Sequence, residues 1–529
     1  MRVQVADTRK KMTFSELETL VENQRKEIKE LENAITQLEF KNIVLQEKYD
    51  LLVYKRFVRT SEAQDETQPE LFDEDAAGIE TGEEGGVEKE TITYQRNKHK
   101  AGRKPLPENL TREERINDLP EEEKTCSCGG RLERIGEDVN EKLIIEEPRI
   151  YVERTVTPKY ACPCCKGGAH DSDGPCVIKQ APAVPAILPG SVASPSMLAH
   201  IFTAKFADHL PYSRQEKQFE RIGVNVSRQD MANWQGKVGI ILLSLYVLLK
   251  DAVRAGKVLR MDETTVQVMG EEERKDTRKS YMWLARGGPP GKPVVIFKYS
   301  SSRKAENIDE FIQGFSGYLQ TDGYAGYDSA VRGRSDIIHA GCFAHGRRKF
   351  FEAQKNGMQA KSAVIGINYI KQLYDIDNGL REKLKKNELD ENNFLTQRKE
   401  RSKVVLEKFR GYLDKRAGEI SAETLLGKAV SYTRNQWDKL VAYLECAELT
   451  PDNNISENAI RPFVVGRKNW LFYKSPTGAE TACILYSVIE TSKLNGLNPS
   501  KYLKTLFERI PYAFSPDDWI ALLPWNISL

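Results

Sequence analysis

Three β-forming runs in close succession constrain the fold of the second half of this chain most strongly. They are KVLRMDETTVQVM from Lys257, SYMWLARG from Ser280 and PVVIFKYS from Pro293. A helical stretch, AENIDEFIQGF, and a further strand-like run, YLQTDGYAGY, follow them. This order predicts an α/β domain over residues 256–475 whose sheet begins with three consecutive strands.

Two acids occupy unusual places in these runs. Asp262 lies inside the first run and Asp322 closes the fourth. Because aspartate is disfavoured in strands and costly when buried without a partner, each needs a compensating charge. If the first and fourth strands are neighbours, both acids can bind one ion or ion pair, with the oxygen ligands that Mg²⁺ (or Mn²⁺) prefers. The pattern indicates a ribonuclease-H-like catalytic core.

A third carboxylate is expected far along the chain. Glu457, in PDNNISENAIRPFVVGRKNWLFYKS, falls in the first turn of a helix that Asn454 or Ser456 can cap. The charged helical stretch at about 350–445 is interpreted as an insertion in the core. Such a glutamate alone is more often a cap or a surface ion pair, but the three contexts together favour metal binding.

Basic clusters flank these acids, as phosphodiester chemistry requires. We assign DNA contacts to Arg347, Arg348, Lys349, Arg467 and Lys468. As an alternative, His339, Cys342 and His345 form a zinc site, although no fourth ligand has suitable spacing.

Heptads over residues 1–58 predict a coiled coil. From Leu17, apolar positions recur in steps of four and three, and the d positions are mainly leucine. The a positions carry Val21, Ile28, Ile35, Asn42 and Tyr49. This combination favours a parallel two-stranded coiled coil, hence a homodimer or larger assembly, with an asparagine that selects the register. The alternative is an amphipathic helix packed on its own protein.

Residues 59–104 read as an acidic, then basic, disordered linker. Twelve acids oppose Lys89 alone between residues 61 and 90, whereas five cations and no acid occupy residues 96–104. Arg103 and Lys104 in this basic arm are candidate DNA contacts. A solvated linker is the alternative, and the sign reversal explains a net charge of only +2.

Two cysteine clusters within residues 105–180 predict a zinc ribbon. Short β-forming runs separate them, and the proposed ligands of a structural Zn²⁺ are Cys126, Cys128, Cys162 and Cys165. Cys164 can substitute for a neighbour, and the alternative is a set of free buried thiols. The odd total of nine cysteines argues against disulfides and for a reducing compartment.

Residues 181–255 are expected to be helical and to include a helix-turn-helix. Gly223 makes the turn, Ser227 caps the second helix, and Arg228 and Gln229 would face a major groove. A helical hairpin that only packs is the alternative. Residues 476–529 are also predicted to be helical, as a cap on the core.

Two features of the sequence bear on the cellular location of the protein. The longest apolar run, Val238–Leu249, is too short to span a bilayer and predicts a buried helix. The first residues, MRVQVADTRKKM, lack the apolar core of a signal peptide. We therefore expect a cytoplasmic protein, nucleoid-associated when it binds DNA.

Several motifs resemble those of insertion-sequence-66 family transposases, a branch of the Asp-Asp-Glu transposases. They are MDETTVQV, LQTDGYAGYD, GCFAHGRRKFFEA, DNNISENAIRPFVVGRKNWLF and NGLNPSKYL. The resemblance implies that Asp262, Asp322 and Glu457 form a catalytic triad for two-metal phosphoryl transfer, which cuts transposon ends and joins the 3′ ends to target DNA. It also implies small accessory proteins from the same element.

Two departures from that family pattern stand out. Thr125 occupies the place of the family's first cysteine, which makes Cys126 the weakest zinc ligand, and Phe343 replaces a tryptophan.

Two other functions compete with a transposase. One is a non-catalytic dimeric DNA-binding regulator, which leaves the strand-borne acids without a reason, and the other is a ribonuclease-H-like nuclease without strand transfer.

Overall fold

A computed structural model describes residues 14–57, 150–161, 178–272, 274–356 and 359–529. The chain divides into two compact units, one within Ala77–Ala183 and one comprising the rest. In the smaller unit, β1 (Lys159–Ala161) pairs antiparallel with β2 (Ile178–Gln180). The proposed zinc ligands, and Arg103 and Lys104, lie outside the described residues, so the zinc-ribbon prediction stays a prediction.

One mixed sheet organises the larger unit. Its strands are β3 (Val258–Val268), β4 (Lys279–Gly287), β5 (Val294–Ser300), β6 (Gly317–Gln320), β7 (Ile337–Ala340) and β8 (Phe472–Tyr473). The order is β5-β4-β3-β6-β7, and β8 pairs with the far end of β3. The first three strands are antiparallel, whereas β6 and β7 run parallel to β3. The strand with Asp262 therefore does neighbour the strand that precedes Asp322.

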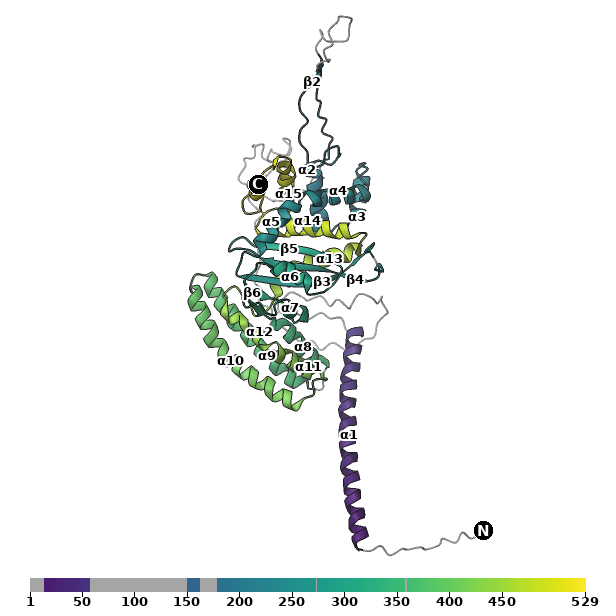
Figure 1. The fold of residues 1–529 in the computed structure, drawn as a ribbon, viewed down its shortest axis with the longest axis vertical. Helices are drawn as coiled ribbons and strands as arrows, with labels where there is room; N and C mark the ends of the chain where they lie inside the picture. Colours follow the sequence, from purple (N-terminus) through teal and green to yellow (C-terminus); the bar gives the residue numbers. More distant parts are fainter. Residues whose placement is uncertain (1–13, 58–149, 162–177, 273, 357–358) are drawn as a thin grey trace, which may run out of the picture. The chain divides into compact units, whose positions relative to one another are not determined.

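Short helices connect these strands, and a group of longer helices follows them. The connections are α6 (Glu306–Ile312) and α7 (Ala325–Ala330). After β7 come α8 (Phe343–Asn356), α9 (Ala360–Lys385), α10 (Glu391–Glu419), α11 (Leu425–Asn435), α12 (Trp437–Val441) and the 3₁₀ helix η2 (Ala442–Glu445). Their apolar faces form a cluster that includes Phe350, Leu373 and Phe409. These helices, which contain the insertion predicted at about 350–445, gather on one side of the sheet (Figure 1).

The C-terminal region is helical, as predicted. It comprises α14 (Pro476–Leu494), α15 (Pro499–Arg509), the 3₁₀ helix η3 (Ile510–Tyr512) and α16 (Pro516–Ala521). However, α14 is an integral part of the core, because it lies along β5 and is buried over most of its length (Figure 1). Ser487 Oγ accepts from Phe297 N at 2.8 Å and Thr491 Oγ1 from Val295 N at 3.1 Å. These bonds satisfy the outer edge of β5, which would otherwise expose unpaired donors.

The helix-turn-helix geometry agrees with the sequence. The helices of this region are α2 (Pro195–Phe206), α3 (Tyr212–Arg221), α4 (Arg228–Ile241) and α5 (Leu243–Val253). Gly223 adopts φ of 76° in the turn between α3 and α4. Ser227 and Asp230 form a capping box, in which Ser227 Oγ accepts from Asp230 N at 3.1 Å. Both the turn and the cap are confirmed.

The apolar run Val238–Leu249 is not one buried helix. It spans the end of α4 and most of α5, with a break at Leu242. Val238, Leu242 and Leu249 are fully buried, whereas Ile240, Leu243 and Val247 on the other face are 66%, 49% and 48% exposed. The prediction was wrong because only one side of these helices meets the core.

The N-terminal helix is confirmed as α1 (Phe14–Phe57). The heptad side chains Ile28, Leu31, Ile35 and Leu38 are 54–64% exposed. No helix of the described residues is long and apolar enough to cross a membrane.

A buried lysine connects α2, α4 and α14. Lys205 Nζ donates to Gln235 Oε1 at 3.1 Å and lies 3.7 Å from the centre of the Tyr212 ring. Gln235 Nε2 in turn donates to Thr481 Oγ1 at 3.1 Å. Burial lowers the pKa of Lys205 from 10.5 to about 7.

This shift predicts a pH-dependent stability. Below pH 10.5 the unfolded chain binds a proton that the folded chain releases above pH 7, so the free energy of unfolding should rise with pH in this window, by up to about 1.4 kcal/mol per pH unit. In Lys205→Met this rise should vanish. Urea unfolding at several pH values measures it, with exposed Lys217→Met as the control. If the free energy of unfolding changes with pH in the same way for wild type and Lys205→Met, then Lys205 stays charged in the folded chain.

Candidate active site

Asp262 and Asp322 come together through the parallel pairing of β3 and β6. The last register pair is Arg260 with Gln320, and each aspartate lies two residues beyond its member of that pair. Neighbouring strands are about 4.8 Å apart, so the two carboxylates enter the same space at the end of β6. Asp322 Oδ1 accepts a hydrogen bond from Tyr324 N at 2.9 Å, which orients it.

Glu457 reaches this space on α13 (Asn454–Trp470). Asn453 Nδ2 donates to Met261 O at 2.9 Å and so attaches the start of α13 to the strand beside Asp262. Glu457 lies in the first turn, as predicted, but neither predicted residue is the cap. Asn453 is the N-cap residue and makes no side-chain cap bond, because its amide is used on β3.

The three acids lie near enough to influence one another electrostatically. Burial raises the pKa of Asp262 well above its ordinary value, and the charges of Glu263, Glu457 and Asp322 raise it further. Burial also raises the pKa of Glu457 to about 7, which the positive charge of Arg348 partly opposes. Both carboxyl groups thus gain from any cation placed between them.

Glu263 is a fourth acid of this cluster, which the sequence analysis missed. Burial and the charge of Asp322 raise its pKa, while Arg303 lowers it. Arg303 Nε donates to Glu263 Oε1 at 2.8 Å and Tyr327 OH to Oε2 at 2.5 Å. With both oxygens engaged, Glu263 has a structural role beside the three other acids. Its place next to Asp262 in the same strand was the available signal.

The two histidines of the alternative zinc site have different surroundings. His339 Nε2 lies 2.8 Å from Thr321 Oγ1, and its Nδ1 lies 3.1 Å from an oxygen of Asp328. His345, in contrast, faces the acids, and burial lowers its pKa to about 4. His339 therefore does not complete a site with His345.

Among the described residues, one group of side chains has metal-binding spacing. It consists of Cys342, His345 and Glu457, whose ligand atoms lie within 4.8 Å of one another. Cys342 Sγ already accepts a hydrogen bond from Asn453 N at 3.2 Å, and burial raises the pKa of its thiol. The cysteine is thus engaged as a neutral hydrogen-bond acceptor.

The donor atoms of the site fit a hard divalent cation. Both carboxylate oxygens of Glu457 and Nδ1 of His345 are buried without a hydrogen-bond partner in the described structure, and Nδ1 lies 4.0 Å from Glu457 Oε1. Buried groups of this kind are costly unless a ligand satisfies them. Together with Asp262 and Asp322, they offer mainly oxygen ligands, the set that Mg²⁺ or Mn²⁺ takes.

The predicted DNA contacts have different surroundings. Arg348 acts electrostatically on Glu457, and Lys349 Nζ lies 5.1 Å from the Tyr432 ring. Arg467 Nη1 donates to Thr264 Oγ1 at 3.2 Å, so its guanidinium connects α13 to β3. The remaining basic candidates of this part of the core are Arg347 and Lys468 on α8 and α13.

At the start of α4, Arg228 and Gln229 occupy the first helical positions. The side chain of Arg228 is 70% exposed, and its Nε lies 3.7 Å from Glu216 Oε2. Gln229 Nε2 donates to Asn233 Oδ1 at 3.0 Å. Both side chains are on the exposed side of the helix-turn-helix.

Family models match nearly the whole chain. A model described as "Transposase IS66 family" matches residues 190–481, and one described as "IS66 C-terminal element" matches residues 487–525. A "zinc-finger binding domain of transposase IS66" matches residues 123–166. A model described as "Transposase C of IS166 homeodomain" matches residues 44–115.

Two proteins of Sinorhizobium fredii (strain NBRC 101917 / NGR234) are similar to this chain over most of their length. Uncharacterized protein y4jD is 32% identical over 432 residues, which cover 80% of this chain and 81% of the relative. Uncharacterized protein y4qI is 32% identical over 426 residues, which cover 78% and 76%. The similarity thus extends well beyond the acidic site.

Cation binding at the site predicts a stabilisation that depends on Glu457. At a free Mn²⁺ concentration one hundred times Kd, wild type should gain about 2.7 kcal/mol. Glu457→Gln should bind Mn²⁺ about tenfold more weakly and lose about half of that gain. Thermal unfolding with and without Mn²⁺ measures both. Glu407→Gln, an exposed glutamate of α10, is the matched control, and an equal gain in all three proteins would exclude Glu457 as a ligand.

Proposed function

This chain belongs to the IS66 family of transposases, and from that premise we propose that it cuts DNA at the ends of its own element and joins the cut ends to target DNA. The observation that carries the proposal is the convergence of Asp262, Asp322 and Glu457 from β3, the end of β6 and α13. Their separation in sequence, about 60 and 135 residues, makes a merely local role such as helix capping insufficient.

The strand order supports a ribonuclease-H-like core. Three antiparallel strands are followed by two strands parallel to the first, and the first and fourth strands pair at the centre. The helices α8 to η2 then form the insertion before the third acid. In such an arrangement the acids lie at the carboxyl end of β6 beside the middle of β3.

In the proposed reaction, Asp262, Asp322 and Glu457 hold divalent cations. When bound, Mg²⁺ or Mn²⁺ supplies Lewis-acid activation of the attacking group and stabilisation of the leaving oxygen. The basic residues that follow the acids, Arg348 and Lys349, offer positive charge for the DNA phosphates. Arg303 and Tyr327 hold Glu263 away from this chemistry, because they satisfy both of its oxygens.

DNA recognition is assigned to several parts of the chain. The exposed first turn of α4, with Arg228 and Gln229, is suited to a major groove. Arg347, Arg467 and Lys468 extend the basic surface around the acids, and the arm with Arg103 and Lys104 contributes non-specific affinity. The cysteine-rich domain binds structural Zn²⁺ through Cys126, Cys128, Cys162 and Cys165. The protein then acts in the cytoplasm on nucleoid DNA, together with accessory proteins of its element.

Cleavage should require Asp322. We expect Asp322→Asn to fold and bind DNA normally but to lose at least about a thousandfold in Mg²⁺-dependent cleavage, because it loses a charge that binds cation. The assay uses a labelled duplex with the element's end and an unlabelled target duplex. Asp375→Asn, an exposed aspartate of α9, is the matched control.

Three other results of this assay would contradict the proposal. A fully active Asp322→Asn would remove Asp322 from the reaction. Wild-type binding without cleavage, with accessory proteins present, would favour a regulator. Cleavage without joining to the target duplex would favour a nuclease.

Assembly is proposed to depend on the exposed heptad face of α1. Replacing the d-position residues in Leu31→Asp/Leu38→Asp should reduce the mass from that of a dimer or larger assembly to that of smaller species, because two charges enter the apolar seam. Sedimentation equilibrium measures the mass. Asn33→Asp/Gln37→Asp, on the outer face of the same helix, should leave it unchanged. A monomeric wild type would refute the coiled coil.

A further inference from the structure

The segment 446–450, between η2 and α13, is held by side chains and not by regular secondary structure. All five of its carbonyl groups accept hydrogen bonds from arginine or glutamine side chains. Backbone carbonyls buried without partners are costly, so these side chains replace the bonds of a helix or sheet. The segment ends seven residues before Glu457, and its position therefore determines where α13 begins.

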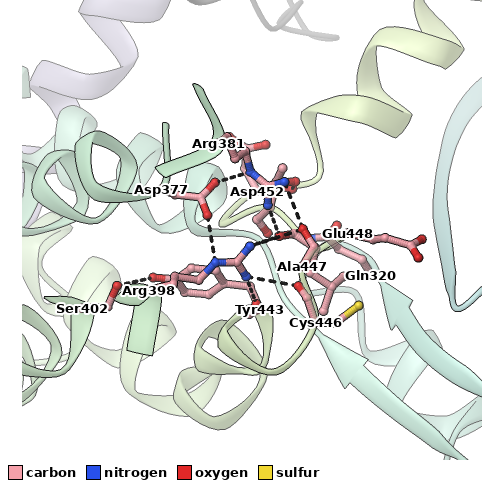
Figure 2. A network of polar contacts seen from close by, with 12 residues as sticks. Gln320, Asp377, Arg381, Arg398, Ser402, Tyr443, Cys446, Ala447, Glu448 and Asp452 are labelled. Atoms are coloured by element: carbon pink, nitrogen blue, oxygen red, sulfur yellow. Dashed lines mark hydrogen bonds and ion pairs between the residues drawn. The ribbon is translucent and has the colours of Figure 1, made fainter. Parts of the chain in front are cut away.

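One buried arginine of the insertion binds most of this segment. Arg398 of α10 is 0% exposed, and Nη1 donates to Cys446 O at 3.1 Å, while Nη2 donates to Ala447 O at 3.3 Å and Leu449 O at 3.2 Å. Its Nε lies 3.1 Å from Asp377 Oδ1 on α9. Figure 2 shows the guanidinium between that carboxylate and the segment.

A second arginine shares the same aspartate. Arg381 Nε donates to Asp377 Oδ2 at 2.6 Å, and Nη1 donates to Ala447 O at 3.0 Å. Asp377 is 1% exposed, so its charge is compensated by the two guanidinium groups that it orients. The planar fork of arginine, with five donors, can satisfy several carbonyls at once, which lysine cannot.

The sheet binds the same segment from the other side. Arg260 Nη2 donates to Glu448 O at 2.5 Å, and Gln320 Nε2 donates to Thr450 O at 2.7 Å. The two side chains also bond to each other, from Arg260 Nε to Gln320 Oε1 at 3.1 Å. They precede Asp262 and Asp322 by two residues each, on the strands that carry these acids. The segment is thus connected to both aspartates.

We propose that Arg398, Arg381 and Asp377 of the insertion, with Arg260 and Gln320 of the sheet, are positioning residues that place Glu457 against Asp262 and Asp322. The helical insertion is then a structural part of the catalytic site, because it holds the segment that leads to the third acid. The identity of the three acids as cation ligands rests on the proposed function. The observed contacts of segment 446–450 do not depend on that function.

The test measures Mn²⁺ affinity as well as cleavage in the full chain. Arg398→Lys keeps the positive charge but loses the fork, and we expect about 10- to 100-fold weaker Mn²⁺ binding and slower cleavage at saturating Mn²⁺. DNA affinity should be unchanged. Electron paramagnetic resonance of free Mn²⁺ gives the affinity. Arg401→Lys, an exposed arginine one turn further along α10, should behave as wild type.

A double-variant comparison separates positioning from general stability. If Arg398 acts through Glu457, adding Arg398→Lys to Glu457→Gln should weaken Mn²⁺ binding by less than twofold, because the ligand that it places is already removed. An equal loss in both backgrounds would overturn the proposal. So would a folded Arg398→Lys with wild-type Mn²⁺ affinity and cleavage rate.

Three further outcomes also have defined consequences. Should Arg398→Lys fail to fold, the less buried Arg381→Lys applies the same test through the Ala447 and Leu449 carbonyl groups, which both arginines bind. If wild type binds Mn²⁺ but never cleaves DNA, the proposed function fails, while the Mn²⁺ affinities still test positioning. If wild type cleaves and the arginine variants match it in both measurements, positioning fails and the proposed function stands.

Discussion

The burial of clustered, mutually repelling carboxylates is the constraint on which the rest of this structure depends. Asp262, Glu263 and Glu457 all have raised pKa values, for which burial is the largest cause and neighbouring acids a further one. A cluster of this kind is unfavourable in a folded chain unless cations or donors offset it. Arg303 and Tyr327 offset it at Glu263, whereas the other acids remain available to a ligand.

The scaffold supports each acid through strand pairing or hydrogen bonds. The central pairing of β3 with β6 sets the two aspartates side by side, and α14 covers the outer edge of the same sheet. The third acid has no strand to hold it, so side chains from both the insertion and the sheet hold the segment before α13. Backbone pairing between strands and hydrogen bonds from arginine to carbonyl groups thus both hold chain segments that carry or precede the acids.

How well each feature could be predicted from sequence depends on how far apart its interacting residues lie in the chain. The cap of α4 at Ser227 was predictable because its hydrogen bonds span three residues. The cap of α13 was not, since Asn453 bonds to Met261, 192 residues away. Glu263 was missed although it adjoins Asp262, because its partners Arg303 and Tyr327 lie 40 and 64 residues away in the chain.

By itself, the sequence determined β3 to β6, the helical insertion and the helix-turn-helix, and it singled out the three candidate acids, because propensity, periodicity and misplaced charges are local properties. Only the tertiary structure decided that β3 lies beside β6, that α14 belongs to the core, and that Arg398 and Arg260 hold one segment. Those features depend on contacts between residues far apart in the chain, from 48 to 196 positions, which no local pattern encodes.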